Sequence, residues 1–433
     1  MRILVTGGYG LIGSACLARL HAAGHDVVGG GRSIAAARRR FPYARWIEAD
    51  FLRLQDANAW QPLLANIDAV VNCVGVLQDG WRDDVERIQQ AGTVALFDAC
   101  ARAGIRRVVH ISALGAEAAG PSRFSRTKAA AEAHLQTLAL DWVILRPALV
   151  LGSGVYGGTA MLRGIAAFPF VVPVLHADSR MQVVYLDDLA ETVARAVAPA
   201  APARVSWDVA HPQVHTLADI ITAIRGWLGF PPRRVLRLPD TFAKVVGLAG
   251  DAIGWLGWRS PARATSFAQL AAGVVGDPAP WLAATGVEPK SLDQLLAARP
   301  ANVQDRWFAR LYLLKPLAIV TLAVATFTTA ALQFALGWKL VAAMPAGVPN
   351  VVVAVYLVPA LISGGVALVL GCGLAFRATA RLALAALIVL TLLHAGDNAL
   401  TAWHFSFFPY GVLTNDVPVV LAMLLTLAIL DDR

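Results

Sequence analysis

The sequence has few charged residues for its length. Charged side chains make up 15% of the 433 residues, whereas hydrophobic side chains make up 57%. With such a composition, either the whole chain is unusually apolar or one part of it belongs in lipid. Residues 316–336 and 351–376 contain no Asp, Glu, Lys or Arg, and nearly all acidic residues precede Lys315. The distribution therefore predicts a C-terminal membrane region.

Cysteines are also few, and they are widely spaced. The four residues, Cys16, Cys73, Cys100 and Cys372, form no Cys-x-x-Cys pair. Neither a zinc site nor a disulfide framework is therefore indicated, and we expect no metal site.

Basic residues are scattered along the chain, although the formal net charge is +8. The one run, Arg38-Arg39-Arg40, is not interleaved with aromatic residues, as a surface that binds single-stranded nucleic acid requires. We interpret the run as a solvated helix face, near anionic lipid or a phosphate, and expect no nucleic-acid partner. The first apolar stretch is too short for a secretory signal and leads directly into a glycine turn, so we expect a cytoplasmic N-terminus.

A strand, a glycine turn and a helix are expected at the start of the chain. The β-branched run 2–6 leads into Gly7-Gly8-Tyr9-Gly10-Leu11-Ile12-Gly13, after which an apolar helical periodicity follows. In dinucleotide-binding folds, Gly7 would permit the tight turn, Gly10 would leave room for the pyrophosphate and Gly13 would let the helix pack closely on the sheet. The phosphate would lie at the helix N-terminus, beside Leu11 and Ile12. The motif predicts a nucleotide site rather than a glycine turn without a ligand.

The end of the second expected strand bears on the choice of cofactor. The strand 26–30 is followed by Gly31-Arg32-Ser33, where an NAD site usually has an acid for the ribose hydroxyls. Arg32 is a forked cation suited to a 2′-phosphate, and Ser33 can donate a hydrogen bond. We therefore expect NADP(H) to be favoured, with NAD(H) as the second choice. The alternative is that Arg32 is an ordinary surface residue.

Further strand-like runs alternate with helical patterns. They cover residues 46–51, 69–75, 108–112 and 142–147. Apolar runs of this kind are typical of parallel strands that are buried on both faces. The fold class that we expect is α/β, with a doubly wound parallel Rossmann sheet.

Several short motifs occur together in this part of the chain. They are the glycine motif, Asp50-Phe51, Asn72-Cys73-Val74-Gly75, Ser112, Lys128 and Arg146-Pro147. The set resembles extended or atypical short-chain dehydrogenases/reductases, and is similar to NAD(P)-binding epimerase-like proteins and to the nucleotide-binding accessory subunit of respiratory complex I. The resemblance covers roughly the first 300 residues. It implies that Asp50 and Phe51 flank the adenine and that Val74 and Gly75 line the nicotinamide side.

The family's catalytic signature is incomplete in this chain. Its reductases use a Tyr as general acid/base four residues before a Lys that lowers the phenol pKa and binds the nicotinamide ribose, while a Ser polarises the substrate carbonyl. The matching stretch is Phe124-Ser125-Arg126-Thr127-Lys128, and Ser112 occupies the serine position. The resemblance therefore implies Ser112 and Lys128 as catalytic residues. Position 124 lies one helical turn from Lys128, but a phenyl ring has no proton to give.

Several interpretations of Phe124 remain open. Lys128 would still hold the cofactor in a scaffold or redox sensor without chemistry. Alternatively, hydride passes to an acceptor that takes its proton from water or another group, as a quinone does. Tyr156 and Tyr185 lie downstream, either as a relocated acid or as ordinary core or rim tyrosines. A nucleotide-sugar epimerase or dehydratase is disfavoured, because those reactions also use the missing Tyr.

Residues 1–302 are expected to form the nucleotide-binding domain, with a smaller substrate-binding portion mainly at 151–300. The stretch 181–190 resembles the family's strand-to-helix element near the substrate cleft, in which Asp187 or Asp188 caps the helix. A helix pattern at 291–296 ends this portion. Residues 241–258 are apolar on one side, and we interpret them as a helix that lies on the bilayer surface or covers the substrate cleft.

Residues 303–433 are expected to form an all-α transmembrane domain of four helices. Residues 316–336 and 351–376 each exceed the ~20 residues needed to cross a membrane. Two shorter spans, 382–393 and 417–430, are connected by the aromatic stretch 403–410, which is typical of a membrane interface. This part resembles a DoxX-like four-helix membrane module.

Basic residues predict the orientation of the spans. Arg306, Arg310 and Lys315 precede the first span, Arg377 and Arg381 join the second to the third, and Arg433 ends the chain, whereas the opposite side has only Lys339. By the positive-inside rule, we expect an inner-membrane protein with both termini in the cytoplasm. His394, Asp397 and Asn398 lie at the outer end of the third span, either as a functional cluster or where a helix end emerges into water.

The sequence therefore predicts a membrane-anchored, NAD(P)(H)-binding oxidoreductase-like protein, with NADP(H) favoured. Its expected partners are the lipid bilayer and a lipid-soluble substrate such as a quinone or isoprenoid. The alternative is a catalytically silent nucleotide-binding scaffold or redox sensor of a membrane-protein complex.

Overall fold

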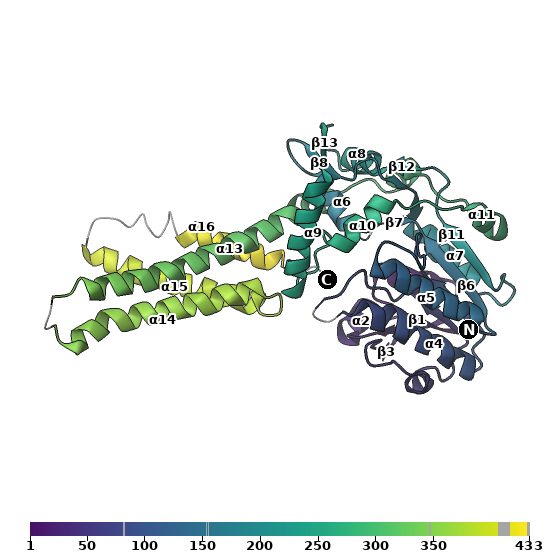
Figure 1. The fold of residues 1–433 in the computed structure, drawn as a ribbon, viewed down its shortest axis with the longest axis horizontal. Helices are drawn as coiled ribbons and strands as arrows, with labels where there is room; N and C mark the ends of the chain where they lie inside the picture. The colour runs from purple at the N-terminus through teal and green to yellow at the C-terminus, as the bar shows by residue number, and fades with distance from the viewer. Residues whose placement is uncertain (81–82, 153, 155, 346–347, 406–415, 431–433) are drawn as a thin grey trace. The chain divides into compact units, whose positions relative to one another are not determined.

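The computed structural model describes residues 1–433 except 81–82, 153, 155, 346–347, 406–415 and 431–433 (Figure 1). The chain divides into two compact units. The first contains Met1–Gly254 and Arg259–Ala309, and the second contains Trp255–Trp258 and Arg310–Arg433. A short segment from the middle of the chain therefore packs with the C-terminal helices.

The first unit is built around a seven-stranded sheet in which every neighbouring pair is parallel. The strand order is β11-β6-β5-β4-β1-β2-β3. The strands are β1 Arg2–Thr6, β2 Asp26–Gly31, β3 Arg45–Glu48, β4 Ala69–Asn72, β5 Arg107–Ile111, β6 Asp141–Pro147 and β11 Val205–Val209. The expected doubly wound sheet is confirmed. The strand order reverses beside β1, which is the place where open α/β sheets bind ligands.

Helices cover both faces of this sheet. They include α1 Leu11–Ala22, α2 Ile34–Arg40, α3 Ala57–Trp60, η1 Gln61–Leu63, η2 Arg87–Ala91, α4 Gly92–Arg102, α5 Arg123–Thr137 and α7 Leu186–Ala196. Alternate residues of β1 enter different cores: Ile3 and Val5 pack with α1 and α7, whereas Leu4 packs on the opposite face with α4 and α5. The apolar strands are continuous in sequence because both faces are buried.

A smaller portion follows the sheet and has its own core of buried residues. Its strands are β7 Leu149–Leu151, β8 Val172–Leu175, β9 Arg180–Met181, β10 Val183–Tyr185, β12 His215–Thr216 and β13 Val235–Leu238, in two-stranded pairs. Its helices are α6 Gly158–Ala166, α8 Leu217–Trp227, α9 Asp240–Trp255, α10 Ala264–Ala272, α11 Ala279–Thr285 and α12 Leu292–Ala298. Strand β10 leads directly into α7, as the sequence predicts, although the side chains of Asp187 and Asp188 do not cap that helix.

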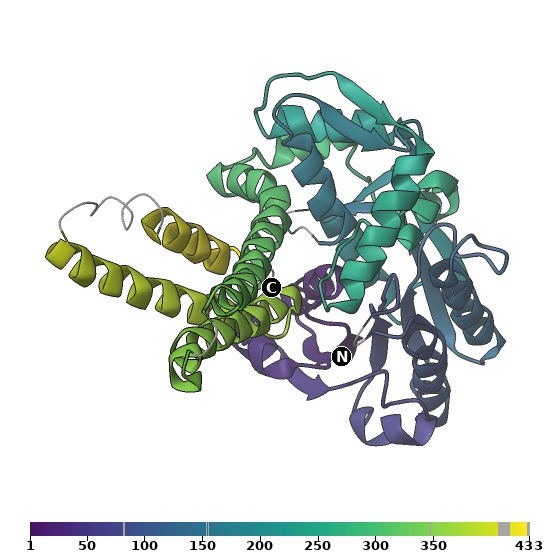
Figure 2. The ribbon, with the colours of Figure 1, turned by 60° about the vertical axis from the view of Figure 1, so that its left-hand side comes forward.

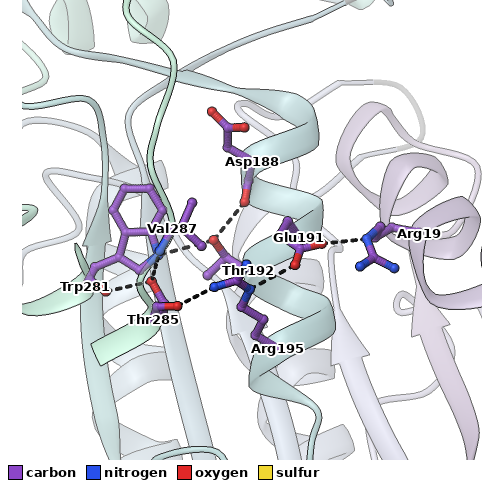
Figure 3. A network of polar contacts seen from close by, with 8 residues as sticks. All are labelled: Arg19, Asp188, Glu191, Thr192, Arg195, Trp281, Thr285 and Val287. Atoms are coloured by element: carbon purple, nitrogen blue, oxygen red, sulfur yellow. Dashed lines mark hydrogen bonds and ion pairs between the residues drawn. The ribbon is translucent and has the colours of Figure 1, made fainter. Parts of the chain in front are cut away.

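Polar contacts fix α1 to α7 and α7 to α11 (Figure 3). Arg19 on α1 donates to Glu191 on α7 at 2.6 Å, and Arg195 holds the other oxygen of that carboxylate at 2.9 Å. The indole of the fully buried Trp281 donates to Thr192 at 3.2 Å. Helix α1, which follows the glycine turn, is therefore held by an ion pair as well as by the apolar core.

The second unit consists of apolar helices, among which α14 packs on α15 and α15 on α16 (Figure 2). They are α13 Val303–Ala342, α14 Asn350–Ala375, α15 Ala380–Phe405 and α16 Val417–Ala428. In the described residues, α13, α14 and α15 are long and apolar enough to cross a membrane. Helix α16 has 12 residues and is about 18 Å long, which is less than a hydrocarbon core of ~30 Å. The described part of the C-terminal region thus has three long apolar helices and a short fourth.

The third apolar helix is longer than the sequence pattern predicts. Helix α15 continues past His394 and Asp397 to Phe405, so these residues do not mark the end of the helix. Residues 406–410 of the expected aromatic stretch lie outside the described residues. Among the described residues there is no group of His, Cys, Asp and Glu side chains that could hold a metal ion.

Candidate nucleotide-binding and catalytic site

The glycine turn after β1 is closed by contacts that side chains would block. Gly7 has a φ of +68°, in the left-handed region that favours glycine. Its carbonyl accepts a hydrogen bond from the Gly10 amide at 2.8 Å. A Cβ on Gly7 would lie 3.0 Å from the Cys73 carbonyl carbon, and one on Gly13 would lie 2.2 Å from the Gly7 carbonyl oxygen. Gly7 and Gly13 are therefore required by close backbone packing.

Helix α1 begins directly at this turn. Its N-cap residue, Gly10, has extended backbone and offers no side-chain cap for the first amides of the helix. A Cβ on Gly10 would meet only the Gly7 carbonyl within 4 Å, at 3.1 Å. An uncapped N-terminus at Leu11 and Ile12, in a turn without side-chain cover, suits the binding of a pyrophosphate.

Asn72 organises the loop that follows β4, beside the glycine turn. Its side-chain oxygen accepts from the Thr6 hydroxyl at 2.7 Å and from the Val74 amide at 3.1 Å, which ties the ends of β1 and β4 together. Its Nδ2 lies 3.2 Å from Nδ1 of the buried His110. Burial, followed by the charge of Lys128, lowers the pKa of His110 well below its usual value. The imidazole is therefore neutral and supports the Asn72 side chain.

Lys128 is fixed between two strand ends. Its Nζ donates to the Ile111 carbonyl at 2.8 Å and to the Val74 carbonyl at 3.2 Å. Gly75 lies beside it, because a Cβ on that glycine would be 3.6 Å from the Lys128 Nζ. Burial lowers the pKa of Lys128 to about 8, while the charge of Glu132 acts in the opposite direction. The amine keeps one further N–H for a ligand at the carboxyl ends of β4 and β5.

Ser112 follows β5 and is nearly completely buried. Its amide donates to the Leu145 carbonyl at 2.7 Å, which fixes the backbone. Its hydroxyl oxygen is buried and has no hydrogen-bond partner in the described part of the chain. A buried polar atom without a partner is costly, so the Ser112 hydroxyl is free to donate a hydrogen bond to a ligand.

Phe124 lies in the first turn of α5, one turn before Lys128, as predicted from the spacing. Its ring is half-buried. The hydroxyls of Ser122 and Ser125 flank this turn, and each lies 2.5 Å from the Gln269 side-chain nitrogen on α10. Gln269 could not be predicted, because nothing in the sequence links a residue on α10 to the start of α5.

The basic residue after β2 has a partner that the sequence analysis did not find. Arg32 forms an ion pair with Asp83 at 2.8 Å, and its backbone amide donates to the Tyr9 hydroxyl at 3.2 Å. Burial alone would lower the pKa of Arg32, but Asp83 more than compensates, so the pKa is raised. Ser33 is exposed at the start of α2. An acid is thus present beside Arg32, although it comes from another loop.

Asp50 and Phe51 lie in different environments. The Asp50 carboxylate accepts from the Leu52 amide at 3.1 Å and is only partly covered. The Phe51 ring is 3% exposed and packs edge-on against Trp60, with ring centroids 5.0 Å apart. The ring therefore belongs to the core, and the Phe51 carbonyl accepts from the Gln55 side chain.

A pocket lies next to the glycine turn in the smaller portion. A Cβ on Gly154, one of its lining residues, would be 3.1 Å from Leu11. Its other lining residues include Thr159, Arg163, Tyr185, Trp227 and Arg299. Burial and then Asp187 raise the pKa of Tyr185 to about 12, which makes this phenol a poorer acid than usual. Lys290 is the cation that lies over its ring, at 5.0 Å from the centroid. Tyr156 is exposed.

Comparisons with known proteins agree with this geometry. Residues 3–207 match the model of the NAD dependent epimerase/dehydratase family. An uncharacterised protein of Mycobacterium tuberculosis is 32% identical over 199 residues, which are 46% of this chain and 20% of the relative. Subunit 9 of the 1 alpha subcomplex of the mitochondrial NADH dehydrogenase [ubiquinone] of Arabidopsis thaliana is 27% identical over 204 residues, which are 46% of this chain and 49% of the subunit. The match thus spans about a fifth of the mycobacterial relative's length and about half of the plant subunit's.

Solved structures share the fold at low sequence identity. UDP-glucuronic acid 4-epimerase from Bacillus cereus, in complex with UDP-glucuronic acid and NAD, is 19% identical with a TM-score of 0.53, and the match covers 72% of this chain and 100% of the enzyme. dTDP-glucose 4,6-dehydratase from Bacillus anthracis, in complex with NAD, is 14% identical with a TM-score of 0.53, covering 71% and 96%. These structures show the fold of the N-terminal part of the chain, and residues 3–207 match the model of the NAD dependent epimerase/dehydratase family.

Proposed function

We propose that this protein is a membrane-anchored NAD(P)(H)-binding oxidoreductase that passes hydride to a lipid-soluble acceptor such as a quinone. The observation that carries the proposal is the combination at α5 and β5. Lys128 is fixed beside Gly75 and Ser112 has a buried hydroxyl without a partner, while residue 124 has no proton to donate. These features support a protein that keeps the residues for holding the cofactor and lacks the usual proton donor.

The residues present fit a dinucleotide. A Cβ on Gly13 would collide with the Gly7 carbonyl, the uncapped start of α1 can take phosphate oxygens, and Lys128 can donate to ribose hydroxyls. When bound, the nicotinamide supplies a hydride. Reduction of a quinone to a quinol takes one hydride and one proton. Water supplies that proton, because residue 124 cannot, and Ser112 donates a hydrogen bond to the acceptor oxygen.

The membrane assignment supports a lipid-soluble acceptor. We infer that the C-terminal helices form a DoxX-like anchor in the inner membrane, with both termini on the cytoplasmic side because Arg377 and Arg381 join α14 to α15 there. A soluble redox domain that is tethered to a bilayer has direct access to substrates dissolved in it. The name of the plant relative, a subunit of an NADH dehydrogenase [ubiquinone], points to the same class of acceptor.

Arg32 favours NADP(H) within this proposal. Its guanidinium lies at the end of β2, where it can pair with a 2′-phosphate in place of Asp83. The competing possibility is that Asp83 accepts from the ribose hydroxyls, as the acid of an NAD site does. The NAD complexes among the solved structures with this fold keep NAD(H) as the second choice.

A second candidate function is a catalytically silent nucleotide-binding subunit or redox sensor of a membrane complex. Phe124 favours it, since a protein that only binds the cofactor has no use for a proton donor. It predicts cofactor binding without turnover.

Measurements on the purified full-length protein in lipid nanodiscs distinguish the oxidoreductase from the silent subunit. NADPH binding is measured by its fluorescence, and oxidation at 340 nm is followed after a short-chain quinone is added. We expect binding with quinone-dependent oxidation that is lost in Lys128→Ala. Binding without oxidation by any quinone would favour the silent subunit. No binding of NADPH, or of NADH measured in the same way, would contradict both.

A further inference from the structure

Helix α9, which belongs to the first unit as far as Gly254, carries a wide apolar surface. Its exposed residues include Val245 at 67%, Leu248 at 69% and Trp255 at 59% of full exposure. At about 100° per residue, the exposed apolar side chains cover about half of the helix circumference without a charged residue among them. The α9 surface, as we call it, consists of Phe242, Val245, Val246, Leu248, Ala249, Ala252, Ile253 and Trp255.

The opposite face of α9 is buried, and it consists of small residues. They are Ala243, Gly247, Gly250 and Gly254. A Cβ on Gly247 would lie 3.1 Å from the Ala264 backbone, and one on Gly250 would lie 1.8 Å from the Ala262 carbonyl oxygen. The start of α10 therefore lies directly against this face. Because its small residues pack against the start of α10, the helix leaves its large apolar side chains exposed on the opposite face.

The chain continues from α9 into the second unit. Trp255 is the last residue of α9, and the indole of Trp258 donates to the Ala375 carbonyl at the end of α14 at 2.7 Å. The Arg377 amide donates to the Leu256 carbonyl at 3.0 Å, and the Arg377 guanidinium lies 5.5 Å from the Trp258 ring centroid. The C-terminal end of α9 is thus joined to the segment that packs on the ends of the long apolar helices.

From these observations we infer that the α9 surface is a membrane-binding surface that lies in the headgroup region of the bilayer crossed by the C-terminal helices. The inference rests on the membrane anchor of the proposed function and adds a second point of attachment. A helix with its large apolar face outward and tryptophans at its end is typical of interfacial helices. Lipid is the occupant because the chain itself brings the end of α9 to a membrane helix terminus. The substrate-binding portion would thereby be held at the surface where a lipid-soluble substrate is dissolved.

Site-directed labelling of the full chain tests the inference. In a background with Cys73→Ala and Cys372→Ala, single cysteines replace Val245 or Leu248 and are labelled with an environment-sensitive fluorophore in nanodiscs. Quenching by spin-labelled lipid is compared with quenching by aqueous iodide. Two controls are Gln136→Cys, on the exposed side of α5, and Leu361→Cys, on an exposed apolar position of α14.

We expect lipid to quench Val245→Cys and Leu248→Cys at least threefold more than Gln136→Cys, with iodide showing the opposite order. Labels at 245 and 248 that iodide quenches as strongly as at 136 would overturn the inference, and protection from both quenchers would assign the surface to a protein partner or a second copy instead. Failure of lipid to quench Leu361→Cys would contradict the membrane anchor itself. Lipid quenching at 361 but not at 245 or 248 would refute the α9 surface alone.

Discussion

The glycine-turn side and the α5 side of the candidate site differ in whether backbone or side-chain atoms determine their geometry. On the glycine-turn side, the geometry depends on backbone atoms, because Gly7 and Gly13 meet carbonyl groups that leave no room for a Cβ. On the α5 side, it depends on side chains, namely Lys128, Ser112 and the residue at 124. For the proposed function, we therefore predict a separation: a side-chain change at position 124 alters proton transfer and leaves the proposed nucleotide site unchanged.

The largest effect is expected from restoring a proton donor at position 124, on the α5 side. Phe124→Tyr places a phenol one turn before Lys128, and general acid catalysis contributes roughly 10²–10⁴-fold. Reduction of simple ketones or aldehydes by NADPH should rise by that order from a low background. The double variant Phe124→Tyr/Lys128→Ala should lose the gain. A wild-type protein that already reduces ketones at enzymatic rates would disprove the separation.

On the glycine-turn side, the expected effect is on binding. In Gly13→Ala, the new Cβ would lie 2.2 Å from the Gly7 carbonyl oxygen, so the turn must move. Overpacking of this kind costs about 1–3 kcal/mol, and a cost of that size in cofactor binding lowers the affinity about fivefold to 150-fold, which NADPH fluorescence measures. Gly226→Ala is the matched control, because a Cβ there meets nothing within 4 Å. Equal losses in both variants would show that the turn is not the binding element.

Arg32 tests the cofactor choice on the same side. Arg32→Ala should weaken NADP(H) binding about tenfold and leave NAD(H) almost unchanged, because a charge-assisted contact at a partly exposed site lies at the lower end of its range. Asp83→Asn removes the competing carboxylate and should strengthen NADP(H) binding. Titration of both cofactors by calorimetry checks both variants. If Arg32→Ala leaves the ratio of the two affinities unchanged, Arg32 is a surface residue.

The smallest effect is the pH dependence of the α5 side. Burial lowers the pKa of Lys128 to about 8, below the value of ~10.4 for an exposed lysine. The amine is therefore charged at pH 7 and loses its proton as the pH rises above about 8. Replacing a charged donor by a neutral one costs about 1 kcal/mol, so cofactor affinity should fall about fivefold between pH 7 and pH 9. Lys128→Met should bind more weakly at pH 7 and show a flat profile; a slope that persists in this variant would assign the titration to another group.

Much of the sheet could be predicted from the sequence, because parallel strands that are buried on both faces are apolar without interruption. The expected strand 2–6 coincides with β1 Arg2–Thr6, and the run 142–147 lies within β6 Asp141–Pro147. Strand β11 Val205–Val209 was missed. It is one of the two edge strands of the sheet and joins it only through its pairing with β6, by the register of Val205 on Val143. Its residues, Val205-Ser206-Trp207-Asp208-Val209, alternate between apolar and polar, so it lacks the continuous apolar run that predicted the central strands. Its place beside β6 depends on pairing with a distant segment, which the local pattern does not encode.

The sequence by itself determined the features that depend on local chain chemistry. These are the strand, glycine turn and helix at the start, the missing phenol at Phe124 and the long apolar helices at the end, since each follows from residue type and spacing within about 20 residues. Only the tertiary structure decided which groups meet across the chain. It pairs Arg32 with Asp83, holds the Lys128 amine between the carbonyls of Val74 and Ile111, and turns the small face of α9 toward α10. Contacts of this kind depend on how distant segments pack, which composition and periodicity do not encode.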